Sequence, residues 1–339
     1  MNEENLDVDA VLRKIQASIQ ANPVIVLGSG ASAPHIPGMG KLAEHLSASI
    51  APNAADSAIW ETVRGKLLSG TGLEEVLNLV HVPDGLLQSV ISATWSYLDQ
   101  ADRAYLQKTI AERTEYPLTK LLRALHQTSN AVSTVITSNY DRLVEYAADQ
   151  VGFDIRTGFV ARHRGYFRPD SFKDPTYQAI NSQKRLHILK PHGSLDWYIE
   201  DAANPCYHAS PPQTDKYVPL IVTPGNDKYR RALEDPLRTI LSHVDTALQD
   251  TDSIACFGYG FNDLHLHQVI TRRLAGAIHN VLIVAKELTP NAKKMVGHKS
   301  VIAIEQFGVG SRVHLGDKGS VDLPSHQLWS LDGFSKVIL

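Results

Sequence analysis

The sequence predicts an α/β protein with a doubly wound parallel Rossmann-like sheet and an all-helical insertion after the first βα unit. Three observations support this fold class. An apolar run ends in a glycine turn within residues 24–33, short apolar runs alternate with helical patterns over residues 131–304, and residues 51–126 show helical periodicity alone. Unbroken apolar runs are typical of parallel strands that are covered on both faces by helices.

The first strand is predicted at residues 24–27, and it runs into the turn Gly28-Ser29-Gly30-Ala31-Ser32-Ala33. The spacing G-x-G-x-x-A is a phosphate-binding pattern, in which Gly28 allows the turn, Gly30 lets a pyrophosphate approach the backbone and Ala33 keeps the next segment near the sheet. The two serines of the turn are expected to donate to phosphate, because no G-x-S-x-G elbow marks a nucleophile. No strand with an acidic end follows about 20 residues later, so a plain strand-to-helix turn stays open as the alternative.

Helices are expected on either side of this strand. Apolar positions at helical spacing predict one helix over residues 8–21 and another near residues 41–49. Residues 51–129 contain no convincing strand, and their apolar positions repeat with helical period, which predicts the insertion. The sheet domain is then expected to comprise residues 1–50 and 130–310.

Alternation of strand and helix patterns resumes after the insertion. Strands are predicted at residues 132–137, 185–190, 220–222, 253–257, 281–285 and 301–304. Helices are predicted at residues 138–150, 235–248 and 264–274 and from residue 289. Residues 202–216 are expected to form a proline-rich loop, and residues 311–339 a mostly irregular C-terminal tail that serves as an interface.

Composition narrows the class of protein. A formal net charge of −3 over 339 residues gives no basic field, so no direct contact with nucleic acid is expected. Cys206 and Cys256 alone build neither a disulfide framework nor a four-cysteine zinc site, and His265 and His267 face different ways on their helix, so no metal is expected. An acidic N-terminus without an apolar run of about 18 residues predicts a cytoplasmic protein without a membrane segment.

Four predicted strand ends carry polar or glycine-rich turns. These turns are Gly28-Ser29-Gly30, Thr137-Ser138-Asn139-Tyr140-Asp141, Lys190-Pro191-His192-Gly193 and Gly258-Tyr259-Gly260-Phe261-Asn262-Asp263. Because the carboxyl ends of parallel strands meet at one edge of a sheet, we expect the four turns to converge on a single crevice.

As an ordered set, these turns resemble the motifs of the sirtuin-like family, and more closely those of its bacterial defence branch of NAD hydrolases than those of its protein deacylases. The family's G-x-G-x-S loop is similar to residues 28–32, its T-x-N-x-D turn to residues 137–141, its catalytic His-Gly to His192-Gly193 and its later glycine turn to residues 258–260. The two Cys-x-x-Cys pairs of the deacylases are missing, and Met39-Gly40-Lys41 replaces their Asp-Phe-Arg segment.

The resemblance implies NAD as the substrate and a set of site residues. The implied catalytic residues are Asn139 and His192, and the implied NAD-binding residues are Gly28, Ser29, Gly30, Ala31, Ser32, Thr137, Asp141, Gly258, Tyr259 and Asp263. Cleavage of the bond between nicotinamide and ribose creates an oxocarbenium-like centre and a neutral leaving group. An Asn amide can orient a ribose hydroxyl or water, and a His can accept a proton.

Structural roles stay open beside these assignments. Asn139 and Asp141 lie at the start of the helix predicted to run to residue 150, and Asp263 precedes another predicted helix, so all three suit capping. His192 stands where a turn residue is equally expected. For Asp263, capping is the preferred interpretation, with contact to the adenosine ribose as the alternative.

The resemblance also implies a biological setting. It predicts the effector of a bacterial anti-phage defence system, in which depletion of NAD halts the infected cell. Control is expected through a homo-oligomer or a partner, with a HerA-type ATPase preferred over a short Argonaute. Three alternatives stay open: a non-catalytic subunit that binds NAD or ADP-ribose, a zinc-free NAD-dependent protein deacylase, and a nicotinamide dehydrogenase.

Overall fold

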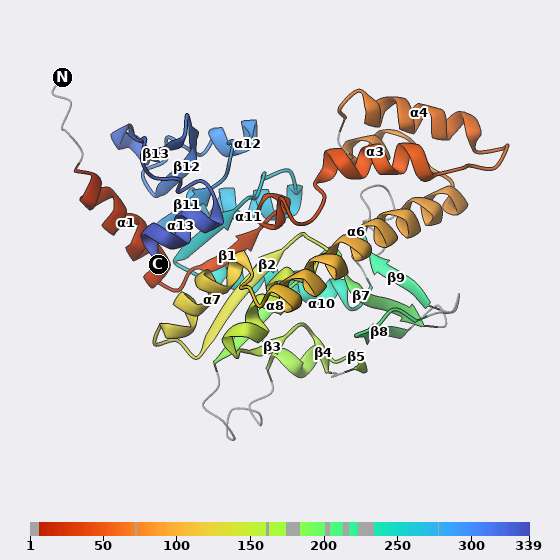
Figure 1. Cartoon of the computed structure of the whole chain (residues 1–339), viewed down its shortest axis with the longest axis horizontal. Helices are drawn as coiled ribbons and strands as arrows, with labels where there is room; N and C mark the ends of the chain where they lie inside the picture. The colour runs from red at the N-terminus through yellow and green to blue at the C-terminus, as the bar shows by residue number, and fades with distance from the viewer. Residues whose placement is uncertain are drawn as a thin grey trace.

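The computed structural model describes residues 7–71, 73–160, 163–173, 184–200, 204–212, 217–222, 234–276 and 278–339. The strands of its main sheet are β1 (Val24–Leu27), β2 (Val132–Thr137), β3 (Asp154–Arg156), β6 (Arg185–Leu189), β10 (Ser253–Phe257), β11 (Asn280–Val284), β12 (Val301–Phe307), β13 (Gly310–Leu315) and β14 (Ser320–Leu323). Their order is β14-β13-β12-β11-β10-β1-β2-β6-β3, and all neighbours pair in parallel except β12-β13 and β13-β14. Figure 1 labels β13, β12, β11, β1, β2 and β3 of this sheet. The predicted doubly wound α/β fold is confirmed.

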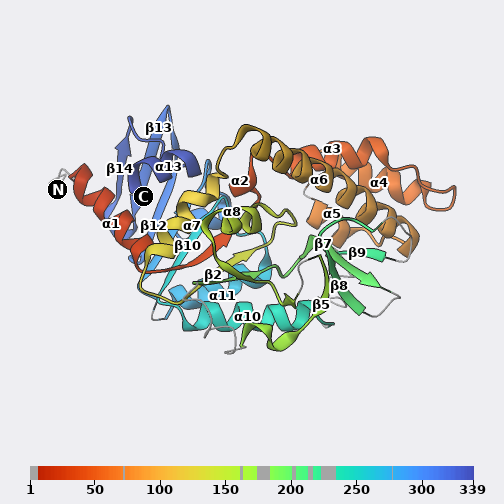
Figure 2. The same ribbon diagram turned by 60° about the horizontal axis from the view of Figure 1, so that its bottom comes forward.

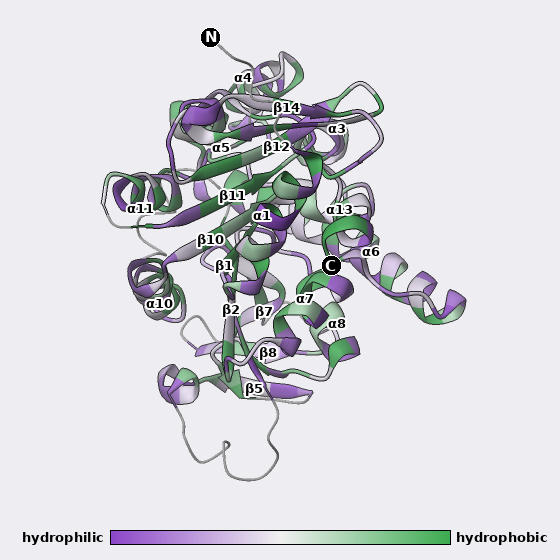
Figure 3. Cartoon of the chain, turned by 90° about the vertical axis from the view of Figure 1, so that its left-hand side faces the viewer, coloured by the Kyte–Doolittle hydropathy of each residue, from purple (hydrophilic) through white to green (hydrophobic). Residues whose placement is uncertain are grey.

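Helices cover both faces of this sheet. One face carries α1 (Val8–Gln20), α7 (Pro117–Gln127), α8 (Leu143–Val151) and α13 (Leu331–Ile338), and the other carries α10 (Leu237–Asp250), α11 (Leu264–Leu274) and α12 (Pro290–Lys293). Figure 3 shows the apolar central strands between these two layers. Within β1, Ile25 and Leu27 pack against the first layer and Val24 and Val26 against the second, which explains the unbroken apolar run.

The described residues between β1 and β2 form helices joined by turns and contain no strand. It contains α2 (Ser29–Ser32), α3 (Met39–Ser49), α4 (Ser57–Leu68), α5 (Leu73–Leu79), α6 (Asp84–Glu112) and α7. Leu42 and Leu46 of α3 pack with α4, α5 and the first part of α6 in a core of their own, whereas α7 packs on the main sheet (Figure 1). The expected division at residues 51 and 129 stays a prediction.

A buried charge cluster joins α6 to α8. The carboxylate of Asp102, which has no exposed surface, accepts hydrogen bonds from the Arg142 backbone N at 2.8 Å, from Arg142 Nε at 3.1 Å and from Tyr146 Oη at 2.6 Å. Arg142 Nη2 also donates to Asp99 Oδ1 at 2.9 Å. These charge-assisted bonds fix the long helix of the insertion to the helix that follows β2.

A second, smaller sheet lies beside α6 (Figure 2). Its strands are β4 (Phe159–Val160), β5 (Arg164–Phe167), β7 (Gly193–Glu200), β8 (Asn204–His208) and β9 (Tyr217–Ile221), in the antiparallel order β4-β5-β8-β7-β9. The loop predicted for residues 202–216 is therefore wrong over β8, where Pro205 masked a strand that pairs with β7. The strand predicted at residues 220–222 overlaps β9, and the turn Thr223-Pro224-Gly225 lies outside the described residues.

The irregular structure predicted after residue 310 is also wrong. Strands β13 and β14 extend the main sheet, and the Phe334 ring of α13 packs edge-on against Phe257 with centroids 5.2 Å apart. Gly316 and Gly319, which suggested irregularity, form the turn between the two strands with φ values of 61° and 89°. No helix among the described residues has the length and apolar content to cross a bilayer.

Candidate active site

The carboxyl ends of β1 and β10 meet at the point where the strand order reverses. Strand β1 pairs with β2 on one side and with β10 on the other. The Gly30 backbone N donates to the Gly258 carbonyl at 3.1 Å, and a Cβ on Gly258, whose φ is 57°, would lie 2.2 Å from the Ala31 N. Glycine is therefore required here for the close approach of two protein turns, at the place where open α/β sheets bind ligands.

Asn139 is fixed against the glycine turn. Its Nδ2 donates to the Gly28 carbonyl and to Ser32 Oγ, each at 3.0 Å, and its backbone N donates to Thr137 Oγ1 at 3.1 Å. Ser32 Oγ in turn donates to Asp141 Oδ2 at 2.7 Å. The turns after β1 and β2 thus form one hydrogen-bonded unit, as the sequence predicted from their common edge.

Lys190 stabilises the turn after β2 through hydrogen bonds, and its side chain has no exposed surface. Its Nζ donates to the Asp141 carbonyl at 2.5 Å, to the Tyr140 carbonyl at 3.3 Å and to Glu145 Oε1 at 3.0 Å. Burial raises the pKa of Asp141, and it raises the pKa of Glu145 to about 7. Sequence reasoning gave Lys190 no role, although a lysine that ends an apolar strand directly before Pro-His-Gly is a usable signal.

His192 meets Asp263 at the same edge. His192 Nε2 lies 2.6 Å from Asp263 Oδ2, with 16% of the His side chain and 6% of the Asp side chain exposed. Asp263 Oδ1 accepts hydrogen bonds from the backbone N of His265 at 2.9 Å and of Leu266 at 3.1 Å, so Asp263 caps α11 as predicted. The contact with His192 was not predicted.

These contacts bring the four turns together. His192 follows β6 and Asp263 follows β10, and the carboxyl ends of β2 and β1 lie between those strands in the sheet. Among the other predicted binding residues, Ser29 and Gly30 are exposed, whereas Ala31 and Thr137 are buried. Tyr259 is also buried, in the apolar core beside Phe261 with ring centroids 4.8 Å apart. Within the described residues, no cluster of three or more His, Cys, Asp or Glu side chains is placed to hold a metal ion.

In comparisons with known proteins, residues 133–298 match a family model that is described as a SIR2-like domain. This span includes Asn139, His192 and Asp263 and excludes the glycine turn after β1. The comparison with curated proteins gives no match.

Solved structures of Sir2 proteins show a distant similarity to the chain. A structure from work on the mechanism and regulation of Sir2 enzymes shares 16% identity and covers 100% of this chain and 98% of that chain, with a TM-score of 0.43. A Sir2 homologue variant in complex with ADP-ribose shares 13% identity, with coverages of 96% and 95% and a TM-score of 0.44. A Sir2 homologue in complex with NAD shares 15% identity, with coverages of 83% and 84% and a TM-score of 0.42.

Proposed function

We propose that this protein is an NAD glycohydrolase that cleaves NAD to nicotinamide and ADP-ribose. The observation that supports this function most directly is the 2.6 Å contact between His192 and Asp263. It lies at the sheet edge where Asn139 and the glycine turn meet. The match of residues 133–298 to a SIR2-like domain agrees with NAD as the ligand.

The proposed reaction breaks the bond between ribose C1′ and the nicotinamide nitrogen. The bonding electron pair stays on that nitrogen, which turns the pyridinium into neutral nicotinamide, so the leaving group needs no proton. The sugar passes through an oxocarbenium-like state, and a water oxygen then adds to C1′. The protein has to hold the ribose, orient the water and remove one proton.

His192 is the proposed base. When the Asp263 carboxylate accepts a hydrogen bond from Nε2–H, the neutral imidazole keeps its lone pair on Nδ1. Among the described residues, Nδ1 has no hydrogen-bond partner, and it is the atom that takes the proton from the attacking water. Asp263 would fix this tautomer and stabilise the imidazolium, as carboxylates do beside catalytic histidines.

Asn139 is proposed to orient the ribose or the water through its amide oxygen. Both hydrogen bonds of Nδ2 go to the protein, to Gly28 and Ser32. Among the described residues, Oδ1 has no partner, so it can accept from a hydroxyl or a water. The sequence suggested that Asn139 could use both its amide donor and its amide acceptor on the ligand. In the structure the donor Nδ2 is bonded to the protein, so the proposed contact with the ligand uses the acceptor Oδ1 alone.

The remaining assignments form part of the same proposal. Exposed Ser29 and Gly30 are proposed to meet the NAD phosphates, and the buried members of the predicted set to hold the shape of the turns. For Asp263, the geometry favours contact with His192 over contact with the adenosine ribose.

The test is incubation of the pure chain with NAD, followed by chromatographic measurement of nicotinamide and ADP-ribose. Equal amounts of both products are expected. Binding of NAD without nicotinamide release, at every protein concentration and with its partner present, would instead indicate a regulatory binding subunit. Consumption of NAD that requires an acyl-lysine peptide would indicate a zinc-free deacylase.

The proposal extends to a cytoplasmic effector of anti-phage defence, controlled by a homo-oligomer or by a HerA-type ATPase, with a short Argonaute as the alternative partner. Its support is the resemblance of the ordered motifs. Two measurements test it. One compares the NAD content of infected cells that carry the unchanged chain with that of cells that carry His192→Ala. The other identifies the proteins that co-purify with the chain when it is expressed from its native operon.

A further inference from the structure

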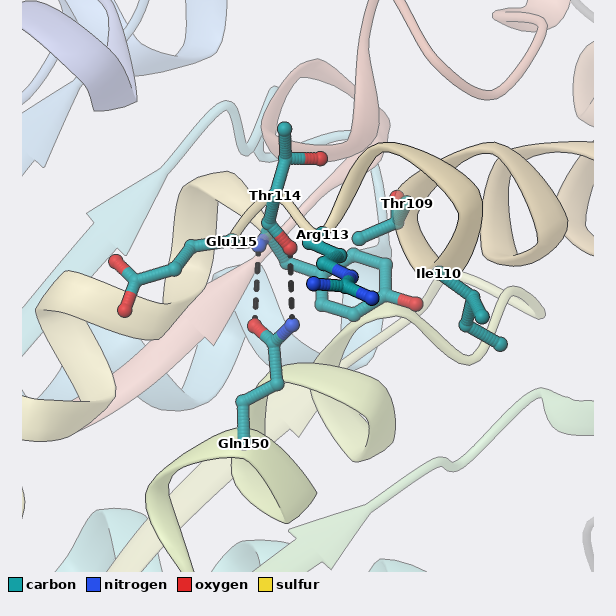
Figure 4. A pocket seen from close by; sticks show the side chains of 7 residues that line it. Thr109, Ile110, Arg113, Thr114, Glu115 and Gln150 are labelled. Atoms are coloured by element: carbon teal, nitrogen blue, oxygen red, sulfur yellow. Dashed lines mark hydrogen bonds between the residues drawn. The ribbon is translucent and has the colours of Figure 1, made fainter.

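Helix α8, which follows the Asn139 turn, is anchored at both of its ends. At its start, Arg142 pairs with two buried carboxylates of α6. At its end, Gln150 lies beside a cavity of ≈ 350 Å³ (Figure 4), where its Oε1 accepts from the Tyr116 backbone N at 3.2 Å and its Nε2 donates to the Thr114 carbonyl at 3.1 Å. Since Gln150 finds its partners in the protein, this cavity requires no ligand, and α8 is a firm support for the turn before it.

The turn that carries His192 lies against the end of strand β9. The backbone N of Val222, which directly follows β9, donates to the His192 carbonyl at 2.8 Å. A Cβ on Gly193, whose φ is 88°, would overlap the Leu220 carbonyl oxygen, so only glycine fits directly after His192. The position of His192 therefore depends on the backbone of residues 220–222.

Tyr140 joins the two turns. It follows Asn139 directly, and its hydroxyl donates to the Val222 carbonyl at 2.7 Å. Its own carbonyl accepts from the backbone N of Leu195, three residues after His192, at 3.0 Å. One residue next to Asn139 is therefore bonded to two backbone segments that hold the His192 turn.

The separation of the two proposed catalytic side chains depends on this connection. Two hydrogen bonds lead from the Tyr140 hydroxyl to the His192 backbone, and Val222 alone lies between them. An amide that orients a water and an imidazole that takes its proton have to keep a constant distance, since a misplacement of about 1 Å can cost about 10²-fold in rate. A side chain that fixes His192 against the anchored Asn139 turn therefore affects catalysis without touching the substrate.

We infer that Tyr140 is a positioning residue, whose hydroxyl fixes the His192 turn relative to Asn139. It acts through the backbone of Val222 and takes no part in the proton transfer. The expected effect on rate rests on the proposed NAD reaction. The hydrogen-bonded connection itself does not depend on that reaction, so it is tested separately.

The test compares Tyr140→Phe, which removes the hydroxyl and keeps the ring, with Ser311→Ala. Ser311 lies on β13, near the edge of the main sheet, and its buried hydroxyl also donates to a backbone carbonyl at 2.7 Å, that of His326. It accepts from the Trp329 backbone N at 3.3 Å as well, so the control loses at least as much hydrogen bonding. Both variants are expected to show a small decrease in melting temperature.

The first readout needs no NAD. Exchange of the Val222 amide hydrogen with solvent, followed by NMR, reports the bond to His192. Tyr140→Phe is expected to speed this exchange at least about tenfold relative to the amides of the central strand β11, so that a general loss of stability cancels. Ser311→Ala is expected to leave the ratio unchanged.

The second readout is steady-state turnover of NAD by the full chain, at a temperature at which both variants are folded. Tyr140→Phe is expected to lower kcat at least about tenfold and to change KM by less than about threefold, because the hydroxyl positions the reacting groups and does not bind NAD. Ser311→Ala should leave both constants unchanged. A purely structural role of Tyr140 would lower the melting temperature and leave kcat of the folded protein as it is.

The inference is overturned if the Val222 amide in Tyr140→Phe exchanges as slowly as in the unchanged chain, or if Tyr140→Phe keeps the unchanged kcat. Absence of nicotinamide release from the unchanged chain would instead contradict the proposed function. The exchange of Val222 would then still support or overturn the connection between the two turns.

Discussion

Asp263 uses its two carboxylate oxygens for two different tasks, since Oδ2 lies 2.6 Å from His192 Nε2 while Oδ1 caps α11. The same carboxylate therefore caps α11 and contacts the histidine. A loss of activity on removal of Asp263 would consequently have two explanations, and the choice of substitution has to separate them.

Asp263→Asn is predicted to lower NAD turnover by about 10²–10⁴-fold while the fold is kept. Asn caps helices as well as Asp does, so α11 keeps its N-cap. An amide that donates to Nε2 instead stabilises the wrong imidazole tautomer, with the lone pair turned away from Nδ1. Turnover is measured as nicotinamide release, and the melting temperature of the variant checks that the fold is kept.

Asp7→Asn is the matched control, because Asp7 caps α1 through the backbone N of Asp9 and contacts no histidine. It should leave turnover unchanged. If Asp263→Asn retained full turnover, Asp263 would be a helix cap and nothing more.

His192→Ala and Asn139→Ala are each predicted to abolish turnover. His192→Ala removes the base and also takes from the buried Asp263 carboxylate its partner at 2.6 Å, so a stability loss of about 1–3 kcal/mol is expected beside the loss of activity. Asn139→Ala also removes the two bonds to Gly28 and Ser32, so a stability loss of about 1–3 kcal/mol is expected beside the loss of activity.

The control for this pair is His265→Ala, since His265 is an exposed histidine that pairs with Asp245 on the surface. It should have normal turnover. Nicotinamide release from either His192→Ala or Asn139→Ala at the unchanged rate would show that the site assignment is wrong.

The parts of the fold that local patterns control were predicted well. The bounds of β1 at residues 24–27, of β2 at 132–137 and of β10 at 253–257 agree with the expected strands. Each is an apolar run that helices cover on both faces, so burial alone marks it. Their common edge also allowed the convergence of the four turns to be predicted.

Features that depend on distant partners were not predicted. Strand β7 is mostly buried along its length and shows no alternation, and β8 contains Pro205, so neither has the pattern of a half-exposed strand. The contact between His192 and Asp263 depends on the sheet order, which no local pattern contains. Lys190 is similar, because its acceptors are carbonyls of a turn that lies far away in the sequence.

Gly258→Ala is predicted to destabilise the chain by about 2 kcal/mol or more and to reduce turnover. The new Cβ would sit 2.2 Å from the Ala31 N, in a backbone conformation with positive φ that L residues rarely adopt. Gly65→Ala in α4 is the control, since its Cβ meets nothing within 4 Å, and it should stabilise the helix by about 0.5–1 kcal/mol. Equal urea midpoints for the two variants would contradict the packing argument.

Asp102→Ala is predicted to cost about 3–5 kcal/mol of unfolding free energy, because it leaves the guanidinium of Arg142 buried with one carboxylate fewer. Glu61→Ala is the control, since it removes an exposed partner of Arg64 and should change stability by about 0.5 kcal/mol or less. Urea denaturation measures both. A similar small change in each would mean that the cluster does not anchor α6.

Glu145→Gln is predicted to raise the unfolding free energy relative to the unchanged chain, and to raise it more as the pH rises. Burial raises the pKa of Glu145 from the ordinary 4.5 to about 7 in the folded state, so the folded state binds more protons than the unfolded state over this range. The contribution of Glu145 to stability therefore falls as the pH rises from about 4.5 to about 7. Gln resembles the protonated form of Glu at every pH, so the variant does not lose this contribution to stability as the pH rises.

The difference in unfolding free energy between Glu145→Gln and the unchanged chain should thus be near zero at pH 4.5. It should grow in favour of the variant to at most about 3 kcal/mol at pH 8. A variant that is less stable at pH 8 than at pH 4.5, relative to the unchanged chain, would mean that Lys190 outweighs burial and that Glu145 is ionised in the folded protein at neutral pH.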